Sequence, residues 1–163
     1  MLRLNKITLT QFKNYPLSAF HINERVIGIC GLNGRGKTNL LDAIYYCCFT
    51  KSYFSRTDGL AVQFDQDGFR LESLFEKHGE EQNIICIYRG VGRKELSLNE
   101  VPYERSSRHI GKFPVVMIAP DDIELISGGG EERRRFMDTS ICSLQQKILF
   151  AKPVQQVRKL VFI

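Results

Sequence analysis

The sequence has no long hydrophobic run, no internal repeat and no low-complexity linker. No apolar stretch approaches the roughly 20 residues that a transmembrane helix needs. The N-terminus alternates polar and apolar residues and lacks the apolar core of a signal peptide. We therefore expect a cytoplasmic protein with no membrane contact. The 163 residues, of which 43% are hydrophobic, suffice for one domain with its own core.

The sequence also lacks cysteine or histidine pairs at metal-ligand spacing. Cys47 and Cys48 are adjacent, and no second pair stands at the distance that a zinc site requires, so a structural zinc ion is not expected. The five cysteines are odd in number and have apolar neighbours, as buried small hydrophobic residues do. We expect reduced thiols in the core or near the surface at Cys30, Cys47, Cys48, Cys86 and Cys142.

Hydrophobic periodicity predicts an α/β chain that begins with a β-hairpin. Residues 2–9 alternate as a half-buried strand, and residues 17–22 return as a second strand after a turn. The apolar run 26–30 predicts a strand buried on both faces. Apolar residues at helical spacing predict a helix from Lys37 to about Phe49. Later in the chain we expect strands at 69–77, 82–88, 95–98 and 115–118, a turn at 99–100, a short helical turn at 121–126 and a longer helix at 131–149.

Residues 31–38 match G-x-x-x-x-G-K-T, the Walker A pattern. The glycines let consecutive N–H groups point inward as a nest for phosphate oxygens, and the positive end of the following helix faces the same anion. Lys37 supplies charge to the β- and γ-phosphates, and the Thr38 hydroxyl suits Mg²⁺. We expect ATP and Mg²⁺ as ligands, although no base-reading motif separates ATP from GTP. The predicted nucleotide-binding residues are Gly31, Leu32, Asn33, Gly34, Arg35, Gly36, Lys37 and Thr38, with Thr38 also the metal ligand.

Two other patterns resemble nucleotide-binding motifs, and we interpret both as structural. Asp121 and Asp122 follow the apolar stretch 115–118 and could act as a Walker B acid. Pro120 forces a turn before them, however, and Asp121 stands where a helix N-cap is expected. Ser127-Gly128-Gly129 resembles an ABC signature. Because two acids open the helix behind it, which would repel phosphate, a helix-entry loop is favoured.

Several further runs resemble the RecF family of bacterial recombination-repair ATPases. The resemblance extends over about residues 1–140 and corresponds to the N-terminal part of the family's sequence. It rests on the opening turn Phe12-Lys13-Asn14-Tyr15, on the extended P-loop at 31–45, on Thr50-Lys51-Ser52-Tyr53-Phe54, and on residues 120–128 and 133–138, which are similar to the family's P-x-D-L-x-L-I-x-G and R-R-x-F-L-D runs.

This resemblance implies a P-loop NTPase fold: the N-terminal lobe of an ABC-type ATPase head with an antiparallel β subdomain, related to the heads of structural-maintenance-of-chromosomes proteins. It implies an ATP-dependent homodimer that binds single-stranded or gapped duplex DNA. It further implies RecR/RecO-type mediator partners and a role in DNA replication, recombinational gap repair and the SOS response to DNA damage. The basic residue of the opening turn, Lys13, is implied as a secondary nucleotide contact.

The same resemblance implies that the chain is incomplete. Family members continue to an ABC signature and a Walker B motif near their C-terminus, whereas this chain stops at Ile163 and departs from the family at about Ser143. We expect residues 1–140 to form the N-terminal part of the head and residues 141–163 to form a diverging helical tail, in a truncated product or a fragment. Such a chain binds nucleotide without hydrolysing it, and we assign it no catalytic residue.

The alternative is an enzyme of another class, a small self-contained P-loop kinase or NTPase that uses Asp121 or Asp122 for Mg²⁺. A kinase of this size needs a lid that closes over the donor nucleotide. The best candidates are Arg133, Arg134 and Arg135, which fall in a predicted helix. The antiparallel strands of residues 69–98 favour the ABC-type head.

A net charge of +5 permits an anionic partner without requiring one. Scattered cations would give salt-dependent, sequence-independent DNA binding. From the residues alone, an ordinary solvated surface is the favoured interpretation. The basic residues concerned are Lys51, Arg56, Arg89, Arg93, Lys94, Arg105, Arg108 and Arg133–Arg135.

Replacing the P-loop lysine tests the predicted phosphate site. Lys37→Ala should weaken nucleotide binding by about 1.5–3 kcal/mol, because a charge-assisted contact to phosphate is lost. Calorimetric titration with ATP and magnesium measures the effect. Unchanged affinity in the variant would reject the role given to Lys37.

Overall fold

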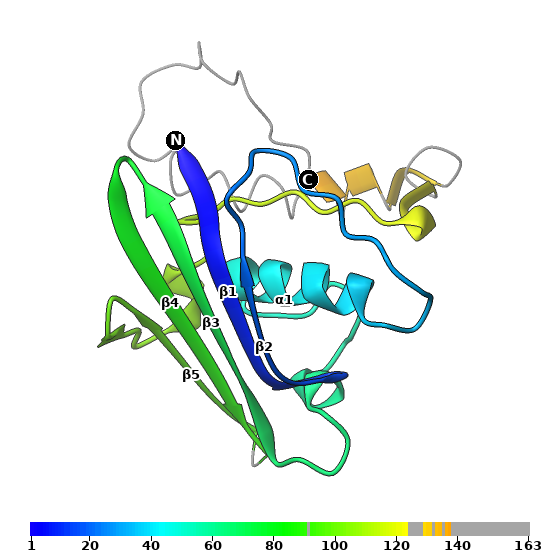
Figure 1. Ribbon diagram of the computed structural model, residues 1–163, viewed down its shortest axis with the longest axis horizontal. Coiled ribbons are helices and arrows are strands. Elements are labelled where there is room, and N and C mark those ends of the chain that lie inside the picture. Colours follow the sequence, from blue (N-terminus) through cyan, green and yellow to red (C-terminus); the bar gives the residue numbers. More distant parts are fainter. Residues whose placement is uncertain (91, 124–128, 132, 135, 138–163) are drawn as a thin grey trace. The chain divides into compact units, whose positions relative to one another are not determined.

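The computed structural model describes residues 1–90, 92–123, 129–131, 133–134 and 136–137. The chain divides into two compact units, of which the first spans Met1–His109 and the second begins at Ile110. The first unit holds an antiparallel six-stranded sheet, in the order β2-β1-β3-β4-β5-β6, together with helix α1 (Figure 1). The strands are β1 (Leu2–Phe12), β2 (Tyr15–His21), β3 (Gly68–Lys77), β4 (Glu80–Arg89), β5 (Arg93–Leu98) and β6 (Val101–Pro102), and the helix is α1 (Lys37–Phe49).

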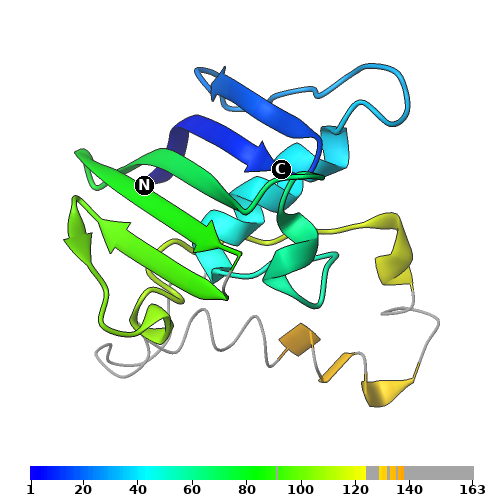
Figure 2. The ribbon, with the colours of Figure 1, turned by 90° about the horizontal axis from the view of Figure 1, so that it is seen from below.

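One face of the sheet packs against α1 and forms the core of the first unit (Figures 1 and 2). Alternation along the strands selects this face, because successive side chains of a strand point to opposite sides of the sheet. Ile7 and Leu9 of β1, Leu71 of β3 and Ile84 of β4 are fully buried. Every α1 residue from Asp42 to Phe49 is buried as well, so α1 is a core helix.

Aromatic side chains tie the helix to the sheet. The Phe12 and Phe69 rings meet edge to face with centroids 5.2 Å apart, and Tyr46 of α1 meets Phe69 at the same separation. Tyr88 of β4 stacks on Phe69 at 5.5 Å. Edge-to-face and offset contacts at such distances add stability beyond the area that they bury. This cluster fixes α1 over β1, β3 and β4.

Most predicted elements of the first unit are confirmed. The opening hairpin is β1 and β2, and the predicted helix Lys37–Phe49 matches α1 at both ends. The predicted strands at 69–77, 82–88 and 95–98 correspond to β3, β4 and β5. The predicted turn is confirmed too, since Asn99 and Glu100 both have positive φ, at 49° and 67°.

Two predicted buried strands are wrong. Residues 26–30 and 115–118 form no strand, and Val26 and Ile118 are 85% and 63% exposed. A strand buried on both faces needs hydrogen-bonded neighbours. Within the described part of the chain, neither segment pairs with the sheet, whose strand order is β2-β1-β3-β4-β5-β6. An apolar run alone therefore did not make a strand here.

The second unit contains a short 3-10 turn, η3 (Pro120–Ile123), in place of the helical turn predicted at 121–126. Residues 124–126 lie outside the described residues. From the helix predicted at 131–149, Glu131, Arg133, Arg134, Phe136 and Met137 are described, and all five are helical. The remainder of that helix, Cys142 and the tail 141–163 also lie outside the described residues.

Thiol reactivity tests the exposure of the segment before the P-loop. Cys30 is exposed, whereas Cys47, Cys48 and Cys86 are buried, and burial raises the pKa of the Cys47 thiol to about 12. In a Cys142→Ser background, a thiol reagent at pH 8 should therefore label Cys30 alone until the protein is unfolded. If Cys30 were protected like the other three, residues 26–30 would be buried after all.

Candidate functional site

The P-loop is an exposed turn that ends at the start of α1. Gly31, Gly34 and Gly36 have φ values of 144°, 77° and 94°, in a region that glycine enters without steric cost. Gly36 is the N-cap of α1 and makes no side-chain cap hydrogen bond, and the first turn of the helix carries no acidic residue. The first N–H groups of a helix have no partner within the helix. In α1 they are thus left available to an anion, with the positive end of the helix dipole behind them.

Lys37 already lies across this loop. Its ammonium donates to the carbonyl oxygens of Gly31 at 2.8 Å and Leu32 at 2.9 Å. These bonds hold the cation at the loop while the surrounding side chains stay open to solvent. Thr38, the next residue, is exposed. The donors that a polyphosphate needs and a hydroxyl suited to a divalent cation therefore stand at adjacent positions, and these residues fit ATP and Mg²⁺.

Lys13, the predicted secondary contact, forms a buried ion pair with Asp42 of α1. The Lys13 ammonium lies 2.6 Å from Asp42 Oδ2, and the two side chains are 13% and 0% exposed. The Ser52 hydroxyl and the Tyr53 N–H each donate to the Asp42 carboxylate at 2.7 Å. The Asp42 carboxylate therefore has three partners, one of which is the Lys13 ammonium. A contact between Lys13 and a nucleotide remains a prediction.

Sequence reasoning missed Asp42. A signal was present, because this acid stands next to apolar residues of the predicted helix, and a fully buried acid is almost always paired. What the sequence could not supply was the partner. Lys13 is 29 positions away in the chain, in a hairpin turn.

The C-terminal end of α1 carries a second polar cluster. Lys94 of β5 donates to the Thr50 carbonyl at 2.6 Å and pairs with Asp58 at 2.7 Å, and the Tyr46 hydroxyl donates to Asp58 at 2.5 Å. Burial, followed by this hydrogen bond to Asp58, raises the pKa of the Tyr46 phenol. A cation at a helix C-terminus is favourable, so Lys94 has a structural role and is not a free DNA contact.

The other first-unit members of the basic set considered for DNA binding are exposed. Arg89 and Arg93 both lie near Glu95, at 3.5 and 3.2 Å, and Arg108 pairs with Glu104 at 3.3 Å. Exposed pairs of this kind are weak. Lys51, Arg56 and Arg105 are exposed. In the second unit, Arg133 and Arg134 are exposed, Arg134 donates to the Gly130 carbonyl at 3.1 Å, and Arg135 lies outside the described residues.

Asp121 and Asp122, which follow residues 115–118, are not arranged as the sequence predicted. Asp121 was expected to be the N-cap, but it lies inside η3, and Asp122 performs the capping. The Asp122 carboxylate accepts the Ala119 N–H at 2.6 Å, and the Asp122 N–H donates to the Ala119 carbonyl at 3.0 Å. A side chain at the third helical position that reaches back to the N-cap N–H is half of a capping box. Ser127 and Gly128 of the signature-like run lie outside the described residues.

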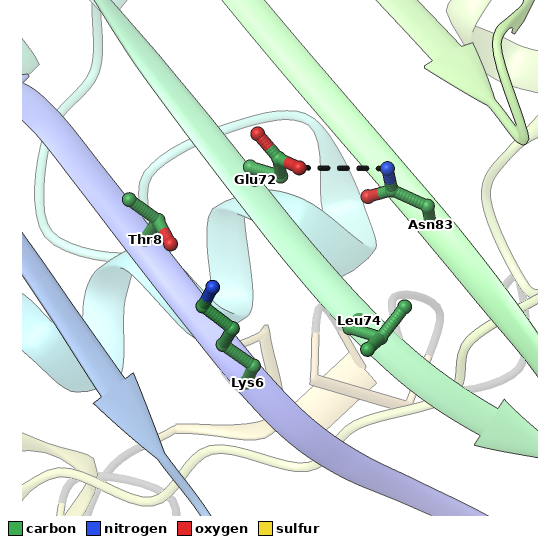
Figure 3. Close-up of a pocket in the computed structure, with 5 residues that line it drawn as sticks. All are labelled: Lys6, Thr8, Glu72, Leu74 and Asn83. Carbon is green, nitrogen blue, oxygen red and sulfur yellow. Dashed lines mark hydrogen bonds between the residues drawn. The ribbon is translucent and has the colours of Figure 1, made fainter.

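A small pocket of about 110 Å³ opens on the face of the sheet turned away from α1 (Figure 3). It is lined by Lys6 and Thr8 of β1, Glu72 and Leu74 of β3, and Asn83 of β4. The Asn83 amide donates to Glu72 at 3.5 Å. The pocket lies on the opposite side of the sheet from the helix that bears the P-loop, so it is a separate feature.

Comparison with known proteins identifies relatives of the chain. The family described as AAA domain matches residues 6–162. The DNA replication and repair protein RecF of Parabacteroides distasonis is 38% identical over 148 residues, which make up 91% of this chain and 40% of that protein. The chain therefore spans about 40% of the length of this curated relative.

Solved structures show the same relationship. A structure described as the recombination mediator protein RecF-ATPrS in the RecFOR pathway has a TM-score of 0.84 and 29% identity, over 91% of this chain and 40% of that one. A structure from work on ATP-driven dimerization and DNA stimulated activation of SMC ATPases has a TM-score of 0.68 over 83% of this chain and 98% of that one. At 19% identity, the second likeness shows the fold alone. The predicted fold class, a P-loop NTPase related to these heads, is confirmed.

No helix in the described part of the chain combines the length and the apolar character needed to cross a membrane.

The Lys13–Asp42 pair predicts a large loss of stability when its charge is removed. Asp42→Asn leaves the Lys13 ammonium buried without a counter-ion, and breaking a buried pair in this way costs about 3–5 kcal/mol. Urea unfolding measures the change in the free energy of unfolding. Glu104→Gln, which breaks the exposed pair with Arg108, is the control and should cost less than about 1 kcal/mol. Equal losses in the two variants would contradict the assignment.

Proposed function

The chain belongs to the AAA domain family and is homologous to the N-terminal part of the DNA replication and repair protein RecF, and from this premise we propose that it binds ATP with Mg²⁺ at residues 31–38. In this proposal the chain is the nucleotide-binding part of an ATPase that acts in bacterial DNA replication and repair. The name of one relative's solved structure, RecF-ATP, supports ATP as the ligand.

The observation that carries the proposal is the uncapped start of α1. At the N-terminus of a helix, the side chain of the N-cap residue usually accepts a hydrogen bond from one of the free backbone N–H groups. Here Gly36 provides no such side chain, and no first-turn acid occupies the position. The glycine φ values bend the loop before it, and the Lys37 ammonium lies at the same end. An anion with several oxygens satisfies all of these donors at once.

Each residue of the loop then has a stated task. The backbone N–H groups of residues 34–38 donate to phosphate oxygens. Lys37 exchanges the carbonyls of Gly31 and Leu32 for phosphate oxygens, which carry more negative charge. Thr38 offers its hydroxyl to Mg²⁺, which neutralises phosphate charge when bound. These tasks concern binding and orientation, and residues 31–38 include no carboxylate that could activate a water molecule.

We further propose that this chain binds ATP without hydrolysing it. By its resemblance to the family, the ABC signature and the Walker B acid belong to a more C-terminal part of such proteins. DNA binding, an ATP-dependent homodimer, RecR/RecO-type partners, a part in the SOS response and action in the cytoplasm are likewise proposals for the whole protein. The names of relatives bear on only some of these proposals: one names DNA replication and repair for RecF, and another names ATP-driven dimerization for SMC ATPases.

The kinase alternative is less favoured than this proposal, because one of its two acids has a structural role. It requires Asp121 or Asp122 to hold Mg²⁺, and the Asp122 carboxylate is bound to the Ala119 N–H at 2.6 Å. A carboxylate that closes a 3-10 turn has a sufficient structural reason to be there. A phosphate-transfer assay with common acceptors tests the alternative directly.

Magnesium dependence tests the role of Thr38. Titration of the chain with a fluorescent ATP analogue should give tighter binding with Mg²⁺ than with EDTA. In Thr38→Ala that gain should shrink, while the affinity in EDTA changes little, because the lost group is a metal ligand and not a phosphate donor. Thr57→Ala, at another exposed threonine, is the matched control. A full magnesium gain in Thr38→Ala would refute the assignment, and absence of binding by the unmodified chain would refute the proposed function.

A further inference from the structure

The turn between β1 and β2 has an unfavourable backbone conformation. Phe12 and Tyr15 pair across it, so Lys13 and Asn14 form a two-residue connection. Lys13 has φ 51°, and Gln11, just before the turn, has φ 55°. A positive φ at the first position of such a turn normally calls for glycine. Residues with side chains keep that conformation only where their surroundings enforce it, and such places are often functional.

Backbone hydrogen bonds and an ion pair hold this turn on two sides. The Lys13 N–H donates to the Ala61 carbonyl and the Gln63 N–H donates to the Gln11 carbonyl, both at 2.8 Å. Phe12 also forms a bridge with Val62. From the other side, Asp42 of α1 holds the Lys13 ammonium at 2.6 Å. The turn is thus fixed to α1 and to the segment 61–63 simultaneously.

Held in this way, the turn places two side chains on the last glycine of the P-loop. The Tyr15 hydroxyl donates to the Gly36 carbonyl at 3.0 Å. The Asn14 amide lies so close that a Cβ at Gly36 would be 2.6 Å from both its Nδ2 and its Oδ1. Asn39 of α1 donates to the Asn14 Oδ1 at 2.8 Å. Gly36 is buried, although the five loop residues before it are exposed.

The contact with Gly36 falls where the helix begins. The carbonyl that accepts the Tyr15 hydroxyl also accepts the Leu40 N–H at 2.9 Å, which is the first backbone bond of α1. The orientation of this peptide sets the directions of the neighbouring N–H groups. Tyr15, at the Gly36 carbonyl, and Asn14, beside the Gly36 Cα, therefore both contact the part of the loop that faces an anion.

We propose that Asn14 and Tyr15 are positioning residues for the P-loop: they hold the Gly36 peptide in its left-handed conformation so that the N–H groups of the loop converge on phosphate. This inference rests on the proposed nucleotide binding. It differs from the predicted role of Lys13, because neither residue has to touch the nucleotide.

Two variants and a matched control test this role. Tyr15→Phe removes the hydroxyl and keeps the ring against Phe20, whose centroid lies 5.8 Å away. Asn14→Ala removes the amide. Asn99→Ala is the control, since the Asn99 side chain accepts the Asn83 N–H at 2.8 Å in a different turn of the sheet. Each variant loses a comparable side-chain contact, but only the first two contacts lie at the P-loop.

Two readouts are needed. Backbone amide NMR without nucleotide should show shifted Gly34, Gly36 and Lys37 signals in Asn14→Ala and Tyr15→Phe, and unchanged signals in Asn99→Ala. ATP affinity should fall about two- to tenfold in the first two variants, the range expected for one hydrogen bond, and stay unchanged in the control. Gly36→Ala should lose less affinity in an Asn14→Gly background than alone, because the 2.6 Å clash is then relieved.

The outcomes separate this inference from the proposed function. If the unmodified chain binds no ATP but the loop amides still shift in the two variants, nucleotide binding is rejected and the positioning of the loop is retained. If the amides and the affinity match those of the control, Asn14 and Tyr15 only stabilise the fold and the inference is overturned. An effect equal in all three variants overturns it as well.

Discussion

The start of a buried helix with no cap is the constraint around which the first unit is organised. The N–H groups at the start of α1 receive no side-chain acceptor from Gly36, and unpaired N–H groups cost free energy unless water or a ligand accepts them. The body of α1 is nevertheless packed against β1, β3 and β4. Packing thus holds the helix in place while its first turn stays open, and the proposed binding of phosphate rests on this combination.

The opening hairpin links the sheet to that site. Its turn is anchored by the pair between Lys13 and Asp42, which forms only when the hairpin and α1 are both in place. Asn14 of the same turn and Tyr15, which follows it, contact Gly36. The hairpin therefore contacts both the core helix and the P-loop. In our proposals, the motif at residues 31–38 supplies the groups that bind phosphate, and the hairpin supports their geometry. In this arrangement the opening Phe-Lys-Asn-Tyr turn and the P-loop act as one structural unit.

The basic residues show why charge in a sequence does not identify a nucleic-acid surface. Lys94 belongs to the same class of residue as Lys51, yet its ammonium closes the C-terminal end of α1 through Thr50 and Asp58. Arg89 and Arg93 both approach Glu95. Partners such as these reduce the charge available to phosphate. Exposed residues such as Lys51, Arg56 and Arg105 retain theirs, so the surface charge of the first unit differs from what a count of its lysines and arginines indicates.

The sequence by itself determined the local features: the hairpin, the bounds of α1, three further strands and the Walker A loop all follow from short-range periodicity and from residues adjacent in the chain. It also indicated the family, because long motifs retain their spacing. The tertiary structure alone decided what depends on distant partners. Residues 26–30 are as apolar as a buried strand, yet they form no strand and all but Ile29 are exposed, because a strand is made by its neighbours and not by its composition. Asp42 pairs with Lys13, and Asn14 meets Gly36, only because the fold brings a turn and a helix together.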